Sequence, residues 1–237
     1  MTAGLVLEDI HTYYGTSHIL FGVSLVVNRG ECVCLLGRNG AGKTTILKTI
    51  IGLASGKQGR ATYNDQSLLG LPPYEIARLG IGYVPDDRII FPDLTVRENL
   101  EIAAKSPIST DLESWTIERI YGLFPSLQAL DGNKGGYLSG GEQQMLTMGR
   151  TLMGNPTLML LDEPGEGLAP IIVAEIASQI KHLKALGLSI LFAEQNMKFA
   201  MEISDKAYVI EGGRVRYEGT IGDLEQRPEI KTKYLMV

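Results

Sequence analysis

The feature that most constrains the fold of this chain is a glycine-rich stretch between residues 37 and 45. It reads Gly37, Arg38, Asn39, Gly40, Ala41, Gly42, Lys43, Thr44 and Thr45. Two glycines bracket a loop whose backbone N–H groups can cradle phosphates, the lysine can reach the outer phosphates, and the hydroxyl after it can hold Mg²⁺. Residues 31–36 read as a short buried strand and residues 44–51 as a helix whose positive N-terminal end would face the phosphates. The stretch therefore predicts a phosphate-binding turn, against the alternative of a glycine-rich turn without a ligand.

Length and composition limit the class of protein. The chain has 237 residues, of which 44% are hydrophobic and 21% charged, so it can bury a full core as one domain or two closely associated subdomains. Its net charge of -5 argues against a nucleic-acid surface, which needs a basic stripe to neutralise phosphates. Acidic residues stand where a signal peptide needs bases, and no run approaches the ~20 apolar residues of a membrane span. We expect a protein in the cytosol, or one attached to a membrane only through other subunits.

The first third of the chain predicts an antiparallel sheet around the phosphate-binding turn. Residues 5–10 and 19–28 alternate as antiparallel strands do, and residues 11–15 read as their connection. Further elements are expected at residues 59–63 (strand), 72–80 (helix) and 81–84 (strand). Cys32 and Cys34 are the only cysteines, and we interpret them as small buried hydrophobes on one face of a strand, where a disulfide between them is geometrically unfavourable.

Between residues 86 and 153 the pattern changes to helices without strands. Thr95 can cap a helix at 96–105, with Glu98 placed to complete a capping box. A second helix is predicted at 111–124, with Trp115 on its apolar face in the core.

The last third predicts a parallel sheet. Strands are expected at 157–162, 188–193 and 206–210, helices at 170–186 and 196–203, and a hairpin at Gly212 and Gly213 into a strand at 214–218. The apolar run at 157–162 is continuous, which is typical of a central parallel strand covered on both faces. The fold class is therefore α/β, a parallel sheet core with an antiparallel β subdomain and an inserted α-helical subdomain. We divide the chain into a nucleotide-binding core, residues 1–85 and 154–237, and the helical insertion, residues 86–153.

Two adjacent carboxylates end the apolar run at 157–162. Asp162 can orient Mg²⁺ through its water shell, while Glu163 can polarise an attacking water as a general base. Taken alone, such an acidic pair also fits a strand that ends at a solvated turn. Because the carboxyl ends of parallel strands gather at one edge of a sheet, the pair is expected to meet the phosphate-binding turn.

A second helix terminus suited to phosphate lies about a hundred residues after the first. Ser139 stands near its cap, and Gly140 and Gly141 allow close backbone approach; the alternative is an ordinary helix cap with flexible glycines. With the phosphate-binding turn, the helical insertion, the acidic strand end and the closing hairpin, the chain resembles the ATPase subunit of an ABC transporter over nearly its whole length. A P-loop kinase or a small GTPase would not explain residues 138–144.

The resemblance implies a dimeric machine that binds ATP and Mg²⁺. Two subunits, either this chain with a paralogous ATPase subunit or two copies of this chain, would pair head to tail. The helix at Ser139 to Gly141 of one subunit would then cover ATP bound on Lys43 of the other. The resemblance also implies that Tyr14 stacks on adenine. The alternatives are that Tyr14 is a packed strand-end aromatic or that Tyr13 takes the role.

Three positions depart from the common ABC pattern. Asp86 replaces the usual glutamine near Mg²⁺ and could ligate the metal, and Gln195 replaces the histidine that usually contacts the γ-phosphate. A neutral amide bond is worth about 0.5–1.5 kcal/mol, against about 1.5–3 for a charged one, so we expect slow hydrolysis at this site. Ala169 stands where the family often has aspartate.

These departures indicate one subfamily. The chain resembles the second ATPase subunit of branched-chain amino-acid importers at residues 88–96, 165–170 and 194–196. Similar subunits serve urea and short-amide importers. The resemblance implies two membrane-spanning permease subunits and a solute-binding protein as partners, and a place on the cytoplasmic face of the inner membrane. Phe91 and Leu94 are candidates for contact with a permease, unless they pack inside the insertion. The rival interpretations are an ABC exporter and a soluble ABC ATPase acting on the ribosome or DNA.

Overall fold

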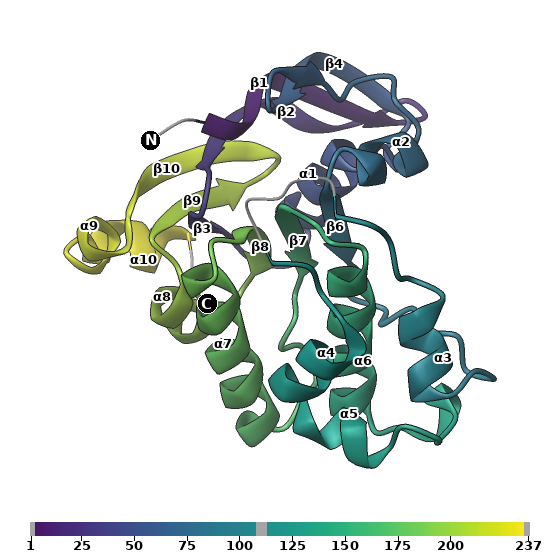
Figure 1. Ribbon diagram of the computed structural model, residues 1–237. Coiled ribbons are helices and arrows are strands. Elements are labelled where there is room, and N and C mark those ends of the chain that lie inside the picture. The colour runs from purple at the N-terminus through teal and green to yellow at the C-terminus, as the bar shows by residue number, and fades with distance from the viewer. Residues whose placement is uncertain (1–2, 108–112, 235–237) are drawn as a thin grey trace.

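Two sheets organise residues 3–107 and 113–234, which the computed structural model describes (Figure 1). The larger sheet has the strand order β10-β9-β3-β8-β7-β6. Its strands are β3 (Cys32–Leu36), β6 (Ile81–Val84), β7 (Leu158–Asp162), β8 (Ser189–Glu194), β9 (Lys206–Glu211) and β10 (Arg214–Thr220). All neighbours in it are parallel except β9 and β10, which form the hairpin predicted at Gly212 and Gly213. Every residue of β3, β7 and β8 is buried, as predicted for strands covered on both faces.

The smaller sheet is antiparallel, in the order β2-β1-β4-β5. Its strands are β1 (Ala3–Tyr14), β2 (Ser17–Asn28), β4 (Gly56–Tyr63) and β5 (Gln66–Ser67). The connection predicted at residues 11–15 was wrong in extent, because pairing continues to Tyr14 opposite Ser17 and only a tight turn remains. Register shifts between Ile10 and His11 and between Thr12 and Tyr13 break the regular alternation in the segment that was taken as the connection.

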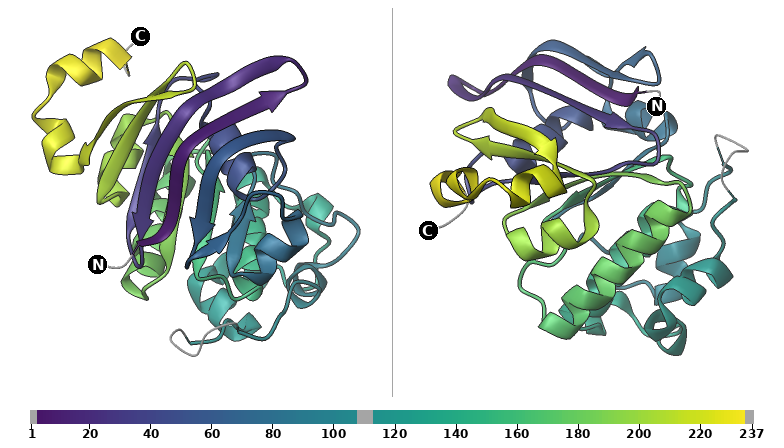
Figure 2. Two further views of the ribbon diagram at one scale, coloured as in Figure 1. Left: turned by 90° about the horizontal axis from the view of Figure 1, so that it is seen from above. Right: turned by 90° about the vertical axis from the view of Figure 1, so that its left-hand side faces the viewer.

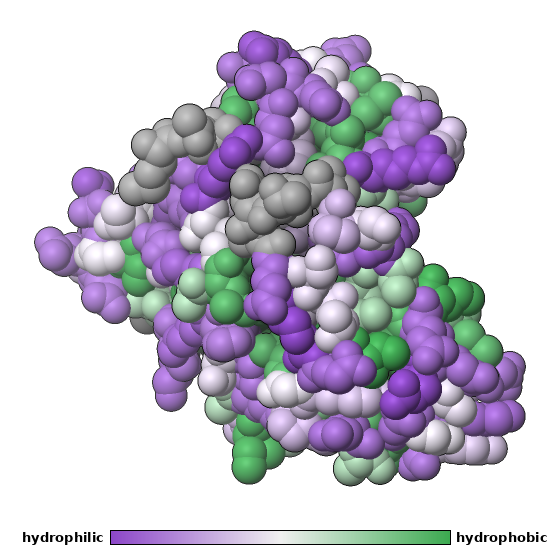
Figure 3. Space-filling view, viewed as in Figure 1, coloured by the Kyte–Doolittle hydropathy of each residue, from purple (hydrophilic) through white to green (hydrophobic). Residues whose placement is uncertain are grey.

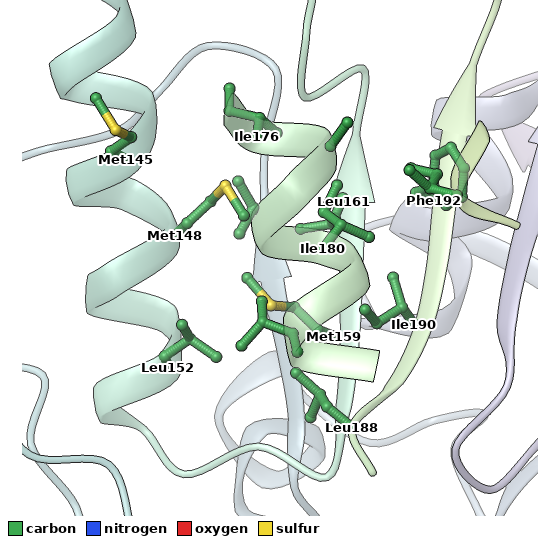
Figure 4. Packing of buried hydrophobic residues seen from close by; sticks show 14 of the residues in the cluster. Met145, Met148, Leu152, Met159, Leu161, Ile176, Ile180, Leu188, Ile190 and Phe192 are labelled. Atoms are coloured by element: carbon green, nitrogen blue, oxygen red, sulfur yellow. The ribbon is translucent and has the colours of Figure 1, made fainter. Parts of the chain in front are cut away.

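Alternate residues of the central strands serve two separate cores. Cys32, Cys34 and Leu36 of β3 face the core shared with α6 (Gly140–Met153), α7 (Pro170–Ala185) and α8 (Met197–Ile203), whereas Val33 and Leu35 face the core shared with the antiparallel sheet and α1 (Lys43–Ile50). Figure 2 shows the antiparallel sheet on one side of the parallel sheet and α7 on the other. Figure 4 shows Met145, Met148 and Leu152 of α6 packing toward α7 and the strands behind it. Both cysteines are buried and free, as predicted.

The segment between β6 and β7 is helical. It contains α3 (Val96–Glu101), α4 (Ile117–Leu123), α5 (Pro125–Ala129), a 3₁₀ turn η1 (Gly135–Tyr137) and α6. The predicted capping box is present, since Thr95 and Glu98 bond each other's backbone N–H groups. α3 ends earlier than predicted, at Glu101.

The helix predicted at 111–124 was too long. It starts at Ile117, because the Thr116 side chain caps it by accepting the Arg119 N–H, and its first two predicted residues lie outside the described part of the chain. Trp115 therefore precedes the helix; it is partly buried against the core, with the Arg119 guanidinium 4.4 Å from its ring centre. The placement of Trp115 on this helix was wrong, whereas its predicted place in the core is confirmed in part, because the side chain packs against the core but is only partly buried.

Three short helices complete the structure: α2 (Pro73–Arg78), α9 (Ile221–Glu225) and α10 (Pro228–Tyr234). The last two follow β10 at the C-terminal end and were not predicted. Within residues 3–107 and 113–234, no helix is both long and apolar enough to cross a membrane.

Candidate nucleotide-binding site

The phosphate-binding turn joins the carboxyl end of β3 to the start of α1. Gly40 and Gly42 have φ values of 77° and 109°, which residues other than glycine rarely adopt. A Cβ at Gly37 would lie 2.4 Å from the Ile210 carbonyl oxygen. α1 has neither a side-chain cap nor an acidic residue in its first turn. Its positive N-terminal end is therefore open toward the turn, as an anion site requires.

Lys43 lies back along the turn. Its Nζ donates to the carbonyl oxygens of Gly37 at 2.8 Å and Arg38 at 3.1 Å, and it pairs with Glu163 Oε1 at 3.1 Å. The Lys43 side chain is only 3% exposed. This geometry places Lys43, which the sequence predicts to bind phosphate, against the carboxylate that the sequence predicts as the general base.

Asp162 lies at the end of β7 and is fully buried. Thr44 Oγ1 donates to one carboxylate oxygen at 2.9 Å, and the Tyr83 hydroxyl donates to the other at 3.1 Å. Burial raises the pKa of the Asp162 carboxyl, the two hydroxyl donors lower it, and the charge of Asp86 raises it again. A buried carboxylate, a hydroxyl and a second carboxylate nearby are the oxygen ligands that Mg²⁺ prefers, so these residues fit the metal.

Glu163 adopts a backbone conformation that is rare for residues other than glycine, with φ of 45°. Its N–H donates to the Ala193 carbonyl oxygen at 3.0 Å, and its own carbonyl accepts the Glu166 N–H at 3.0 Å. The Glu166 side chain bonds Glu163, and this bond and the charge of Glu163 raise the pKa of Glu166. Such conformations persist where the surrounding structure fixes them, and they cluster at functional sites.

A cavity of about 440 Å³ opens above these groups. Its lining residues are Tyr14, Ile19, Asn39, Gly40, Gly42, Lys43, Thr44, Thr45, Asp86, Glu163 and Glu166. Tyr14 is 40% exposed, whereas the Tyr13 ring stacks on the ring of His18 with centroids 4.2 Å apart. Of the two tyrosines considered, Tyr14 is the one that lines the cavity.

The second predicted phosphate-binding helix terminus lies elsewhere in the same chain. Ser139 caps α6 in a capping box with Glu142. The backbone at Gly140 lies close to the Arg88 guanidinium, because a Cβ there would be 2.8 Å from Nη1. None of Ser139, Gly140 and Gly141 lines the cavity at Lys43, so one subunit does not bring the two phosphate-binding termini together.

Gln195 lines a neighbouring cavity of about 480 Å³ between α7 and α8, with Glu163 and Glu166 on the shared side. Beside it, the buried Glu194 accepts the N–H groups of Gln195 and Asn196, each at 2.8 Å. Burial raises the pKa of Glu194. The sequence analysis missed Glu194, Glu166 and Tyr83. Each stands within four residues of a motif, but only strand pairing and the turn after β7 bring them to the site.

Together, the glycine turn, its lysine and the two acids at the end of the adjacent parallel strand define the phosphate site of a P-loop ATPase. Comparison with known proteins agrees with this geometry. The family model for ABC transporters matches residues 20–166, which is more than half of the chain. The chain therefore belongs to the ABC transporter family, as the sequence analysis predicted.

Three relatives align over most of their length. The chain is 41% identical over 98% of its length to the high-affinity branched-chain amino acid transport ATP-binding protein BraG of Pseudomonas aeruginosa, of which it covers 99%. It is 40% identical over 89% to the probable branched-chain amino acid transport ATP-binding protein LivF of Archaeoglobus fulgidus, covering 89% of that protein. It is 33% identical over 98% to the lipopolysaccharide export system ATP-binding protein LptB of Escherichia coli, covering 97%.

Solved structures confirm the predicted fold class. The chain superposes on the ADP conformation of MJ1267, an ATP-binding cassette of an ABC transporter, with a TM-score of 0.80 and 28% identity, and each chain covers 98% of the other. A nucleotide-free ATP-binding cassette from an ABC transporter gives a TM-score of 0.81 at 28% identity, with 97% of each chain covered. The chain is thus an ATP-binding and ATP-hydrolysing subunit of an ABC transporter.

Proposed function

We propose that this subunit powers the import of branched-chain amino acids from the cytoplasmic face of the inner membrane. The observation that carries the proposal is the near full-length similarity to BraG and LivF, whose names both specify branched-chain amino acid transport. The substrate does not enter this subunit in such a machine, so the proposal rests on similarity and on no pocket residue. A solute-binding protein and two permease subunits are the partners it requires.

In the proposed site, Lys43 and the N–H groups of the turn hold the phosphates of ATP, and Tyr14 stacks on adenine. Thr44, Asp162 and Asp86 would hold Mg²⁺, which would neutralise charge on the outer phosphates. Glu163 accepts a proton from the attacking water. Its pairing with Lys43 at 3.1 Å keeps this carboxylate beside the phosphate site before ATP enters.

We propose that a complete site needs two subunits. The helix that begins after Ser139, with Gly140 and Gly141 at its N-terminus, would cover ATP on Lys43 of a second copy or a paralogous subunit. The separation of these two regions within one chain supports this arrangement, because neither Ser139 nor the two glycines lines the cavity at Lys43 of the same chain. Closure by ATP then follows from its different affinity for the open and paired states.

The segment that leads from β6 into α3 is the proposed contact with a permease. We take residues 86–153 as the helical insertion and the rest of the chain as the core. Ile89 and Phe91 are 58% and 41% exposed. Hydrophobic residues, in green, lie among hydrophilic ones on the surface near this segment (Figure 3). Leu94 is only half-buried. Phe91→Asp should uncouple ATPase activity from uptake without unfolding the subunit, and retained uptake would refute the assignment.

The experiment that tests the transported substrate uses a strain lacking this subunit, complemented by the wild-type chain or by Glu163→Gln. Labelled leucine, isoleucine and valine should enter only with the wild-type chain. If the strain lacking this subunit instead loses uptake of labelled urea or short amides, the subunit belongs to one of the related importers.

An exporter is the second candidate, and the similarity to LptB supports it. In that case the deletion strain would take up all these solutes normally. Purified complexes would contain permease subunits without a solute-binding protein. This outcome would refute the importer proposal.

A further inference from the structure

The Tyr83 hydroxyl has no part in the function described so far. Tyr83 lies near the end of β6, which runs parallel to β7 with Tyr83 opposite Leu160. From there its phenol reaches across to Asp162, two residues further along β7, and donates to Oδ2 at 3.1 Å. The tyrosine ring is partly buried against the core shared with α1.

The two donors to Asp162 fix the orientation of its carboxylate. Thr44 gives its single proton to Oδ1, so the lone pairs of the Thr44 hydroxyl point away from Asp162 and are available to a cation. Tyr83 holds Oδ2. Without that bond, the carboxylate could rotate about its last torsion, which is broad and weakly restrained, and a fully buried oxygen would lose a donor.

We propose that Tyr83 is a positioning residue of the magnesium site, which orients the Asp162 carboxylate for Mg²⁺ bound with ATP. The proposal rests on the proposed function of Thr44 and Asp162. Residues that orient a metal ligand typically contribute about 10- to 100-fold to metal affinity when tested by mutation. A residue that only fills the core would not distinguish nucleotide with the metal from nucleotide without it.

Tyr63 provides a matched control within the same protein. Its hydroxyl bonds Thr157 Oγ1 at 2.7 Å, just before the first residue of β7. That bond lies at the amino end of the strand whose carboxyl end carries Asp162. Tyr63 itself belongs to β4 of the antiparallel sheet. Tyr63→Phe therefore removes a comparable phenol hydroxyl at the amino end of β7, away from the phosphate site.

The test measures binding of the fluorescent analogue MANT-ATP to the wild-type subunit, Tyr83→Phe and Tyr63→Phe, each in EDTA and in excess Mg²⁺. The Kd in EDTA divided by the Kd in Mg²⁺ is the factor by which the metal strengthens nucleotide binding, and this ratio reports the coupling between nucleotide and metal. We expect Tyr83→Phe to reduce this ratio about tenfold with the Kd in EDTA unchanged. Tyr63→Phe should leave both values as in the wild type. In ATPase assays, the Mg²⁺ concentration for half-maximal rate should rise, while the KM for ATP at saturating Mg²⁺ stays constant.

A wild-type ratio in Tyr83→Phe would overturn the proposal. An equal loss of affinity in EDTA and in Mg²⁺ would also overturn it, because that result means Tyr83 is merely structural. If the wild-type subunit itself bound MANT-ATP no better with Mg²⁺, the magnesium site of the proposed function would fail first, and the role of Tyr83 with it.

Discussion

The buried side-chain amide of Asn99 holds the loop before α3, and the effect of removing it on stability can be estimated from its hydrogen bonds. Asn99 is fully buried in α3. Its Oδ1 accepts the Phe91 N–H at 2.9 Å, and its Nδ2 donates to the carbonyl oxygens of Phe91, Leu94 and Thr95 at 2.9, 3.1 and 2.9 Å. This loop is the one proposed to contact a permease.

The loss in the free energy of unfolding caused by Asn99→Ala can be estimated by asking which backbone groups lose all of their hydrogen-bond partners. The three carbonyls each keep another donor, namely the N–H groups of Leu94, Gly135 and residue 99 itself. The Phe91 N–H loses the acceptor that it has in the structure. One orphaned donor and three weakened acceptors give a loss of about 2–4 kcal/mol in the free energy of unfolding.

Urea unfolding followed by circular dichroism measures this loss, and hydrogen exchange locates it. The Phe91 amide should exchange faster in Asn99→Ala, while amides of β3 keep their protection. Glu101→Ala is the control, because this exposed residue of the same helix makes only a 3.8 Å pair with Arg97 and should cost less than about 0.5 kcal/mol. A loss below about 1 kcal/mol in Asn99→Ala, or unchanged exchange at Phe91, would refute the reasoning.

Three further predictions concern the site and its support. Gly213→Ala should destabilise the subunit by more than about 3 kcal/mol and weaken MANT-ATP binding, because a Cβ there would lie 1.8 Å from the Ile19 carbonyl oxygen at φ of 68°. Gly212→Ala, also at positive φ but with open space around it, should cost only about 1–2 kcal/mol; equal losses in urea unfolding would contradict this. Burial raises the pKa of Glu194 in the folded state. The wild type should therefore be as stable as Glu194→Gln below the ordinary carboxyl pKa of 4.5 and lose stability relative to it as the pH rises above that value. Melting temperatures of the two proteins that change in parallel from pH 4 to 8 would disprove this. Gln195→His should raise ATP turnover in the assembled complex about fivefold, because a charged hydrogen bond exceeds a neutral one by about 1 kcal/mol; unchanged or lower turnover would count against the idea.

Local patterns were sufficient for the phosphate-binding turn, since the glycines at 40 and 42 adopt the positive φ angles that their residue type allows. The capping box at Thr95 was equally readable, because a cap and its partner lie three residues apart, and Ser139 was correctly placed at the cap of its helix. Where local signals were ambiguous, boundaries were wrong. A register shift hid the full length of β1, and Thr116 rather than an earlier residue caps α4.

The sequence by itself determined which groups we propose to carry the chemistry: Lys43, Thr44, Asp162 and Glu163 are each marked by residue type and spacing. Only the tertiary structure decided how they meet. Parallel pairing of β6 with β7 and of β7 with β8 brings Tyr83 to Asp162 and fixes Glu163 against Ala193, across sequence separations that no local pattern encodes. The physical reason is that hydrogen bonds between side chains depend on strand register and on the angle at which each side chain leaves its strand, and both are set by packing of the whole core.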